Sequence, residues 1–581
     1  MIILEAGSHG LNNSGPVKRP VVWSITASDS AAGAGMQADV AVCNQWGAQV
    51  QCVVTAITVQ NSAGFQQGFA LPLSQVQAQW QALKADGWPA AIRVGWLPND
   101  DDLWQWLADA LDQAPCPVIW DPVISATDVS PDSYSEPESK KSAMFSADLE
   151  RYRALLACVD VITPNNAEAR LLLGLPDSLK GDVADPSDNR PSSQQMARAL
   201  SYMGPSTVII TGGDSSLNEH PLQVITEVFH RAVSEEQGAI PEEQGSIPEE
   251  QSPEQIGMPA FQLLSERIMH QAHGTGCHFA AALAAGLASG SRLYDAILKA
   301  SEYALQCLES ASERNSGYHN CFAAAQQSAA DHRVSVVVTA SAPDLASVSQ
   351  EAAFGASGDH ASVDSLYPLD GGVDLSAMTL AFPVLDKPLG LYGLVDNLEW
   401  LKRLLTLGVD TLQWRVKHQS VNYRQETAEA IALCREAGVP LYINDDWPLA
   451  LELEAWGVHL GQEDLCTADL TALAQAGLCL GVSTHTKWEI ARARAIKPSY
   501  IAFGPVFPPL SKKLKYPPLG LEQLSKWCEE NSDFPLTCIG GITEDNVADV
   551  VATGMSSVAI VTALANDEGL AKRFERIRQA I

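Results

Sequence analysis

Two cations and an amide alternate with apolar residues along one short segment of the chain. Gln413, Arg415 and Lys417 are separated by Trp414 and Val416. On a β-strand this spacing places the first three side chains on one face and the tryptophan and valine on the other. Cations on the inner face of an apolar strand are costly unless an anion binds there. The pattern predicts an anion site, although taken alone it also fits an exposed strand with its polar face in solvent.

Carboxylates follow the next two apolar strands. Residues 439–446 end in Asn444 and Asp445, and residues 457–464 end at Asp464. Carboxylates at the ends of neighbouring strands are a common way to hold Mg²⁺, which keeps its other positions for water and phosphate oxygen. The alternative is that these acids cap the helices that follow.

Short apolar runs that end in Gly, Ser, Thr or Lys continue to the end of the chain. They occupy residues 480–485, 501–512, 538–542 and 557–562. Strand, loop and helix units at this spacing predict a (β/α)₈ TIM barrel with its chemistry at the carboxyl ends of the strands. The late Gly and Ser/Thr turns would offer backbone N–H groups to a phosphate.

On these motifs, residues 388–581 resemble thiamine-phosphate synthase. The resemblance implies condensation of 4-amino-2-methyl-5-(diphosphooxymethyl)pyrimidine with a thiazole phosphate, which gives thiamine phosphate and releases pyrophosphate. In that family the pyrophosphate leaves first, so the reaction needs charge stabilisation rather than a protein nucleophile.

The resemblance also implies roles for individual residues. Asp445 and Asp464 would hold Mg²⁺, while Arg415, Lys417 and Lys512 would be catalytic. The substrate-binding positions would be Gln413, Trp414, Arg415, Val416, Lys417, Asn444, Ser483, Pro509, Leu510, Ser511, Lys512, Gly541, Val561 and Thr562.

The N-terminal half carries a second set of motifs. An apolar strand at residues 21–28 runs into a loop of small residues, and residues 53–61 form a β-rich run that ends in two amides. The sharpest motif is His273-Gly-Thr-Gly-Cys277, which opens an Ala-rich helix. Its backbone N–H groups and helix dipole predict an anion hole, and a thiol at a helix N-terminus is expected to have a lowered pKa.

In this order the motifs resemble hydroxymethylpyrimidine/phosphomethylpyrimidine kinase, a ribokinase-like doubly wound α/β fold, over residues 20–320. The resemblance implies ATP as co-substrate and Cys277 as the base. Gly274 and Gly276 would form the catalytic anion hole. Gln60 would bind the pyrimidine, and Asp39 would border the same pocket.

Three substitutions depart from the kinase pattern. Ala27 stands where that family has glycine, Thr211 stands where it has lysine, and His278 replaces a small hydroxyl residue. A threonine cannot neutralise phosphate charge during transfer. The sequence therefore keeps an alternative open, in which an active synthase carries a catalytically impaired, pyrimidine-binding or structural kinase-like domain. A pure scaffold would require the whole synthase pattern to be coincidental.

Composition limits the partners. The 581 residues carry a formal net charge of −32, which argues against nucleic acid and anionic membrane surfaces. The N-terminus lacks a signal-peptide pattern, and no apolar run reaches the ~18 residues of a membrane span. The twelve cysteines form no Cys-x-x-Cys pair. Reduced thiols, a cytoplasmic location and small-molecule substrates are expected, with a homo-oligomer left open.

Three segments fall outside the motifs. Residues 235–255 repeat a Glu-Glu-Gln pattern with a proline in every repeat, and residues 130–142 are rich in Ser, Pro, Glu and Lys. Proline excludes a coiled coil, so both are expected to be disordered inserts. Residues 321–387 match neither family and are a linker or unassigned, although residues 333–339 have a strand-like pattern.

Overall fold

The structure is a computed structural model of the chain. It describes residues 19–61, 64–124, 149–175, 191–212, 223–230, 260–266, 268, 272–314, 318–320, 335–338, 382–416, 421–508, 516–561 and 569–581. The inserts expected at 130–142 and 235–255 lie outside the described residues. Two compact units are present, one of residues 1–183, 191–222 and 267–330 and the other of residues 184–190, 223–266 and 331–581. The domain boundaries expected from sequence stay a prediction.

The first unit is built on a mainly parallel sheet whose strands run in the order β7-β6-β5-β4-β1-β2-β3. Only β3 is antiparallel, to β2. The strands are β1 (Val21–Ser28), β2 (Gln49–Asn61), β3 (Gly64–Ala70), β4 (Ala91–Val94), β5 (Val118–Trp120), β6 (Val161–Ile162) and β7 (Thr207–Ile210). The central strands are buried, as expected for parallel strands covered on both faces.

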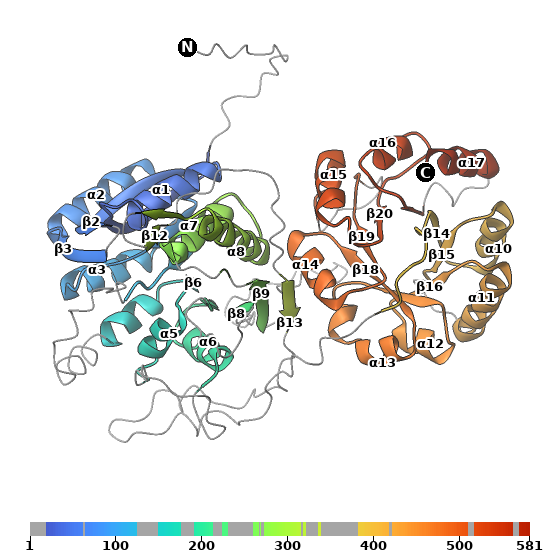
Figure 1. Cartoon of the computed structure of the whole chain (residues 1–581), viewed down its shortest axis with the longest axis horizontal. Coiled ribbons are helices and arrows are strands. Elements are labelled where there is room, and N and C mark those ends of the chain that lie inside the picture. The colour runs from blue at the N-terminus through green and yellow to red at the C-terminus, as the bar shows by residue number, and fades with distance from the viewer. Residues whose placement is uncertain are drawn as a thin grey trace, which may run out of the picture. The chain divides into compact units, whose positions relative to one another are not determined.

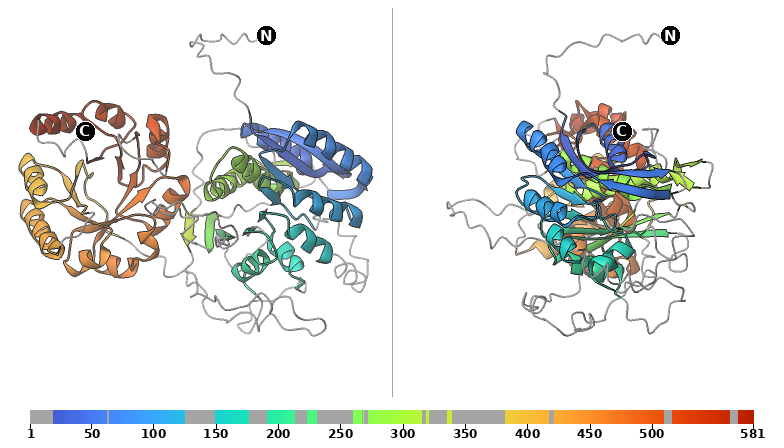
Figure 2. Two further views of the ribbon diagram at one scale, coloured as in Figure 1. Left: turned by 180° about the vertical axis from the view of Figure 1, so that it is seen from behind. Right: turned by 90° about the vertical axis from the view of Figure 1, so that its left-hand side faces the viewer.

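Helices cover both faces of these strands (Figures 1 and 2). They are α1 (Gly35–Gln45), α2 (Leu73–Asp86), α3 (Asp101–Leu111), α5 (Asn166–Leu172), α6 (Ser193–Ser201), α7 (Thr275–Ala288) and α8 (Leu293–Glu309). A small three-stranded sheet contains β10 (Ala272–His273), β11 (Ser312–Arg314) and β12 (Tyr318–Asn320). The strand–helix alternation confirms the doubly wound α/β fold predicted for this part of the chain.

Local signals explain where these helices start. Asn165 and Glu168 form a reciprocal capping box at the start of α5, and Asp100 caps α3 through the N–H of Leu103. In contrast, α7 starts at Gly274, whose φ of 95° is in the left-handed region. Helix α7 is buried along most of its length, because alanines let it pack closely between the sheet and α8.

The second unit contains three antiparallel strands and a closed barrel. The strands β8 (Gln223–His230), β9 (Ala260–Glu266) and β13 (Ser335–Val338) follow the order β13-β9-β8. Strand β13 confirms the strand pattern noted at residues 333–339, inside the segment that the sequence left unassigned.

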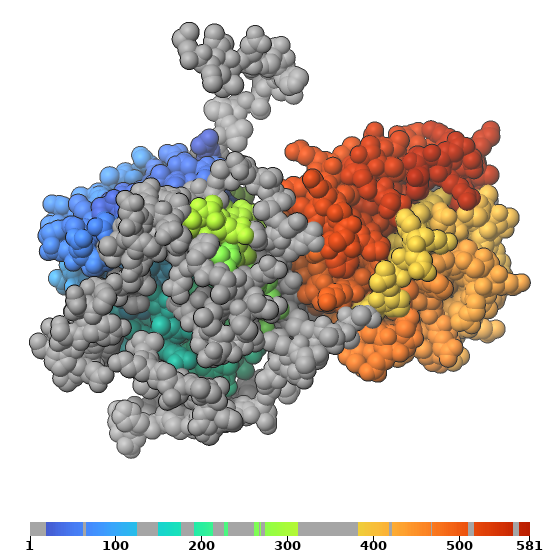
Figure 3. Space-filling view, viewed as in Figure 1, coloured from blue at the N-terminus to red at the C-terminus, as the bar shows by residue number. Residues whose placement is uncertain are grey.

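Eight parallel strands close the barrel in sequence order, which confirms the predicted TIM barrel. They are β14 (Leu391–Val395), β15 (Thr411–Trp414), β16 (Leu441–Asn444), β17 (Gly457–Leu460), β18 (Cys479–Thr484), β19 (Tyr500–Phe503), β20 (Leu536–Ile539) and β21 (Val558–Ile560). Strands β14 and β21 pair in parallel and complete the ring. In the space-filling view the first (yellow) and last (red) parts of the barrel meet at its surface (Figure 3).

The barrel strands alternate with an outer layer of helices. These are α10 (Leu398–Leu407), α11 (Tyr423–Ala437), α12 (Trp447–Glu452), the 3₁₀ turn η5 (Asp464–Cys466), α13 (Leu470–Gln475), α14 (Lys487–Ile496), α15 (Gly520–Glu530), α16 (Val547–Val551) and α17 (Leu570–Ala580). One apolar cluster packs strands against helices, and a smaller one that includes Tyr392, Tyr442 and Tyr500 fills the interior of the barrel.

Among the described residues, no helix is long and apolar enough to span a membrane. The ten cysteines in this part of the chain are all free, in keeping with the reduced thiols expected from sequence.

Candidate functional site

Two carboxylates and a cation meet at the carboxyl ends of neighbouring barrel strands. Asp445 directly follows β16, Asp464 follows β17, and Arg415 follows β15. Burial and the charge of Asp464 raise the pKa of Asp445 to about 6, while Arg415 opposes the shift. The two acids therefore lie close enough to repel each other. The repulsion would be relieved by a divalent cation, so the pair fits the Mg²⁺ site expected from sequence.

The backbone holds both acids in place. Asp445 has a φ of 63°, a left-handed conformation that is uncommon for a residue with a side chain. The side-chain amide of Asn444 donates a hydrogen bond to Asp445, and the backbone N–H of Gly461 donates to Oδ2 of Asp464 at 3.1 Å. Local strain of this kind is frequent at functional sites, because the surrounding structure must hold it.

A chain of neutral polar side chains crosses the barrel interior below this pair. Nε2 of Gln413 donates to the Tyr392 hydroxyl at 3.1 Å, and that hydroxyl lies 2.9 Å from the Tyr500 hydroxyl. Nδ1 of His459 lies 2.7 Å from the same Tyr500 hydroxyl, and Nε2 lies 2.7 Å from Oγ of Ser483. Burial, with Arg415 and His485 nearby, lowers the pKa of His459 to about 3, so the imidazole is neutral.

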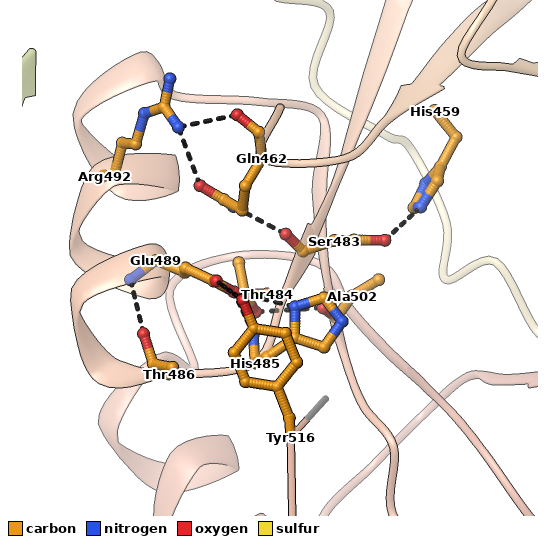
Figure 4. Close-up of polar contacts among 10 residues, drawn as sticks. All are labelled: His459, Gln462, Ser483, Thr484, His485, Thr486, Glu489, Arg492, Ala502 and Tyr516. Atoms are coloured by element: carbon orange, nitrogen blue, oxygen red, sulfur yellow. Dashed lines mark hydrogen bonds and ion pairs between the residues drawn. The ribbon is translucent and has the colours of Figure 1, made fainter. Parts of the chain in front are cut away.

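The backbone at Ser483 is fixed by a second buried group (Figure 4). Nε2 of Gln462 donates to the carbonyl oxygen of Ser483 at 2.7 Å. Arg492 on α14 in turn donates to both the carbonyl and the side-chain oxygen of Gln462, at 2.9 and 3.1 Å. These contacts position Ser483 at the barrel mouth with its hydroxyl beside His459.

A buried carboxylate ties together the two chain segments beside this strand end. Glu489 on α14 accepts hydrogen bonds from the backbone N–H of His485 at 2.6 Å and from the Tyr516 hydroxyl at 2.9 Å. The rings of His485 and Tyr516 stack with centroids 4.4 Å apart (Figure 4). Tyr516 lies just after the segment that contains Lys512 in the sequence.

The late glycine turn has the close backbone packing expected of a phosphate cradle. Gly540 and Gly541 have φ of 109° and 66°. A Cβ on Gly541 would lie 2.7 Å from Cβ of Phe507, so the turn is in contact with the loop that follows β19. Val561 follows β21 and is exposed. The structure thus brings the Gly541 turn against the loop after β19, while its contact with a thiazole phosphate stays a prediction.

Several predicted synthase residues either have side chains that pack in the apolar core or lie outside the described part of the chain. The indole of Trp414 is fully buried toward α11, where Nε1 donates to Thr427 at 3.1 Å, so its side chain is not available to a substrate. Val416 packs against the apolar core. The predicted residues outside the described part of the chain are Lys417, Pro509, Leu510, Ser511, Lys512 and Thr562.

In the first unit, Asp29 organises the loop after β1. Its carboxylate accepts backbone hydrogen bonds from Ala31, Gly33 and Ala34 at 2.7, 3.0 and 2.8 Å. No role was predicted for Asp29 from the sequence.

The same loop also reaches β2. The Ser30 hydroxyl donates to the carbonyl oxygen of Gln60 at 2.7 Å and accepts from the N–H of Gln60 at 3.0 Å. The loop is therefore joined to the backbone of Gln60, while contact of the Gln60 side chain with a pyrimidine stays a prediction.

The Gly-Thr-Gly-Cys turn packs directly on this loop. A Cβ on Gly274 would lie 1.9 Å from the carbonyl oxygen of Gly33, so only glycine fits there. Cys277 receives a backbone hydrogen bond from Gly35, at the start of α1. A Cβ on Gly276 would lie 3.8 Å from Oδ1 of Asp121, so this carboxylate faces the turn.

A buried ion-pair cluster lies beneath the turn. Arg93 on β4 donates to Oδ2 of Asp39 at 3.2 Å and to Oδ2 of Asp121 at 2.5 Å. Ser24 adds a 2.5 Å hydrogen bond to Asp39, which is almost completely buried. Asp39 thus adjoins the Cys277 turn as part of an internal ion pair. Sequence analysis missed Arg93, although its alternation with apolar residues in β4 marks an inward charge.

The expected lowering of the Cys277 pKa is wrong for this structure. Burial and the charge of Asp121 raise the pKa of the thiol to about 12, and Arg93 and the Gly35 hydrogen bond offset only part of this shift. A helix N-terminus favours the thiolate, but desolvation disfavours it more strongly here.

The three departures from the kinase pattern also have clear positions. Thr211 follows β7 and forms a parallel bridge with Asn165. Ala27 is buried in β1, with its carbonyl oxygen 2.5 Å from where a Cβ on Gly35 would be. His278 is buried on α7, where Nδ1 lies 2.8 Å from the carbonyl oxygen of Gly274. His278 therefore stabilises the turn rather than replacing a hydroxyl within it.

Comparisons with known proteins match each half of the chain to a family. Residues 391–564 match the family model of thiamine monophosphate synthase, and residues 29–239 and 256–321 match that of phosphomethylpyrimidine kinase. Thiamine-phosphate synthase of Proteus mirabilis (strain HI4320) is 49% identical over 185 residues, which cover 32% of this chain and 86% of the relative. The enzyme of Enterobacter sp. (strain 638) is 50% identical over 184 residues, 32% of this chain and 87% of the relative.

Solved structures that resemble the chain come from both classes. The pyridoxal kinase from Staphylococcus aureus in complex with AMP-PCP and pyridoxal is 21% identical with a TM-score of 0.41, over 56% of this chain and all of that one. Thiamine phosphate pyrophosphorylase from Pyrococcus furiosus is 29% identical with a TM-score of 0.30, over 33% and 95%. On its sequence matches, the chain belongs to the thiamine-phosphate synthase family and carries a phosphomethylpyrimidine kinase domain in the same polypeptide, as a transferase of thiamine biosynthesis.

Proposed function

We propose that the chain catalyses three consecutive steps of thiamine biosynthesis. The kinase domain uses ATP to phosphorylate 4-amino-5-hydroxymethyl-2-methylpyrimidine and then its phosphate. The barrel condenses the resulting diphosphate with 4-methyl-5-(2-phosphoethyl)thiazole and releases pyrophosphate. The observation that carries the synthase assignment is the Asp445–Asp464 pair beside Arg415, at adjacent strand ends of a closed barrel.

The residues around this pair suit departure of a pyrophosphate. Mg²⁺ held by Asp445 and Asp464 would neutralise charge on the leaving group. Arg415 and Asn444, together with Lys417 and Lys512, would bind the pyrophosphate oxygens. The neutral interior formed by His459 and the tyrosines offers no nucleophile of raised reactivity, which agrees with a step that needs only charge stabilisation.

In the kinase domain the glycines of the α7 turn would bind the transferring phosphoryl group, and Gln60 would bind the pyrimidine. Cys277 is proposed as the base. Its raised pKa means that the thiol is protonated as it stands, so proton removal from the substrate requires the anion hole and Arg93 to stabilise the thiolate.

A second candidate function keeps the synthase but gives the kinase domain a binding or structural role. Thr211 at the end of β7 and the raised pKa of Cys277 both favour this alternative. A cation at position 211 would balance charge during transfer, and threonine provides none.

One experiment separates the candidates. The full chain is given hydroxymethylpyrimidine, Mg·ATP and thiazole phosphate, and thiamine phosphate is followed. A parallel reaction receives the pyrimidine diphosphate directly. Product in both reactions supports all three steps, whereas product only from the supplied diphosphate supports the impaired kinase. Absence of product in both reactions contradicts the proposal.

A further inference from the structure

Five side chains from five barrel strands form one continuous hydrogen-bonded chain. It runs from Gln413 on β15 through Tyr392 on β14, Tyr500 on β19 and His459 on β17 to Ser483 on β18. Its two ends, Gln413 and Ser483, are among the substrate-binding positions that the resemblance to thiamine-phosphate synthase implies, and there they would contact the pyrimidine diphosphate. The three middle residues were not singled out by the sequence.

A glycine in a neighbouring strand leaves space for these side chains inside the barrel. Position 481 on β18 is glycine, and a Cβ there would lie 2.1 Å from Cζ and 2.3 Å from the hydroxyl of Tyr500. The missing side chain lets the Tyr500 ring cross β18 and reach His459. Tyr500 and Tyr392 are at most 1% exposed, so water cannot readily replace either hydroxyl as a partner.

The hydrogen bonds that link these five side chains all donate in the same direction. Nε2 of Gln413 donates to Tyr392, which is then free to donate to Tyr500, and Tyr500 donates to Nδ1 of His459. A neutral imidazole has one N–H, so Nε2 of His459 then donates to Ser483. The hydroxyl proton of Ser483 is left to point away from the chain, as a donor.

The two ends therefore have opposite roles. Among the described residues, no hydrogen bond occupies Oε1 of Gln413, which is left as an acceptor while Ser483 is a donor. A 4-aminopyrimidine presents the matching edge, with a ring nitrogen that accepts beside an amino group that donates. A 4-oxo analogue presents the reverse, with a ring N–H beside a carbonyl.

We infer that Tyr392, Tyr500 and His459 are positioning residues that fix the donor at Ser483 and the acceptor at Gln413, so that the synthase site selects a 4-aminopyrimidine over its 4-oxo analogue. The inference rests on the proposed synthase function. None of the three middle residues needs to touch the substrate, because each acts by setting the proton of its neighbour.

The test removes one hydroxyl from the chain. Tyr500→Phe leaves the ring in place but breaks the chain, which frees the His459 tautomer and lets the Ser483 hydroxyl turn inward. Tyr442→Phe is the matched control, because Tyr442 packs edge-on to Tyr500 at 5.1 Å while its buried hydroxyl forms no hydrogen bond to the five residues of the network. The KM for the amino diphosphate and the inhibition constant of the 4-oxo diphosphate are measured with full-length protein.

We expect the preference for the amino compound, as the ratio of these two constants, to fall about tenfold in Tyr500→Phe, the value of one hydrogen bond. Tyr442→Phe should keep the wild-type ratio. Tyr392→Phe is the second variant: it frees the Gln413 amide and should also reduce the ratio if Tyr500→Phe fails to fold.

The outcomes separate the inference from the proposed function. Wild-type protein that makes no thiamine phosphate from the supplied diphosphate would remove the proposed function itself. Active wild-type protein whose ratio is unchanged in the folded Tyr500→Phe or Tyr392→Phe variant overturns the inference alone. An equal loss of ratio in Tyr442→Phe also overturns it, because packing rather than proton direction would then set the preference.

Discussion

Replacing Arg93 by methionine should destabilise the kinase unit far more than removing a surface arginine. Arg93 is 1% exposed and pairs with Asp39 and Asp121, which are 1% and 6% exposed. Removing one partner of a buried ion pair costs about 3–5 kcal/mol, because the remaining charge stays buried. At about 2–4 °C per kcal/mol for a domain of this size, the unit should melt roughly 6–20 °C lower.

The loss should also depend on pH. Burial raises the pKa of Asp39 above its ordinary 3.8, and Arg93 partly opposes this rise. Without Arg93 the folded-state pKa rises further, so the folded protein takes up a proton that the unfolded chain does not. That group contributes stability below pH 3.8, and the contribution is lost as pH rises through the folded-state pKa. The difference from wild type should therefore be smaller at pH 5 than at pH 8.

Scanning calorimetry of the full chain measures both effects, and hydrogen exchange of peptides from β4 and β15 assigns the transition to the kinase unit or the barrel. Arg424→Met is the control, since Arg424 and its partner Glu452 in the barrel are 66% and 53% exposed. Such a pair is worth about 0–1 kcal/mol. Equal losses in the two variants, or a loss in Arg93→Met that does not change with pH, would refute the reasoning.

Three further predictions concern catalysis. Thr211→Lys should raise pyrimidine phosphorylation, measured as ADP release, and the uncharged Thr211→Met should not; no gain with lysine would point to the first loop or to a non-catalytic domain. Arg415→Ala should lower synthase turnover by about 10²-fold or more with little change in the KM for thiazole phosphate; a selective loss of thiazole binding would contradict the assigned role. Mg²⁺ binding to the barrel, measured by calorimetry, should weaken as pH falls below about 6, because protonation of Asp445 competes with the metal. A Mg²⁺ affinity that is constant from pH 5 to 8 would exclude Asp445 as a ligand.

The fold and the strand-end residues were readable because they follow simple periodicities. A spacing of two placed Gln413 and Arg415 on one side of a strand and Trp414 on the other, and the structure buries Trp414 against α11. Chain order then brings the ends of β16 and β17 together, since parallel neighbours in a barrel end at the same rim. Asp445 and Asp464 meet for that reason alone.

The desolvation of the Cys277 thiol could not be predicted from the sequence in the same way. A helix N-terminus is visible in the sequence at Cys277, and it predicts a lowered thiol pKa. The depth of burial and the approach of Asp121 come from β5, far away in the chain, and together they reverse the direction of the shift. A pKa inferred from one local motif counts the favourable local contact and leaves out the tertiary cost.

The interior hydrogen-bonded chain shows what tertiary structure adds to a correct fold prediction. Tyr392, His459 and Tyr500 each lie in an apolar strand, where a single polar residue usually forms only local hydrogen bonds. Their connection depends on Gly481, whose missing side chain lets one ring cross a neighbouring strand. A glycine inside a strand weakens it, so its presence at a barrel position indicates that another group needs the space. Here that group is the Tyr500 ring, which links the two proposed substrate contacts, Gln413 and Ser483. Which of these two residues donates a hydrogen bond therefore depends on the whole hydrogen-bonded network inside the barrel, and not on either residue alone.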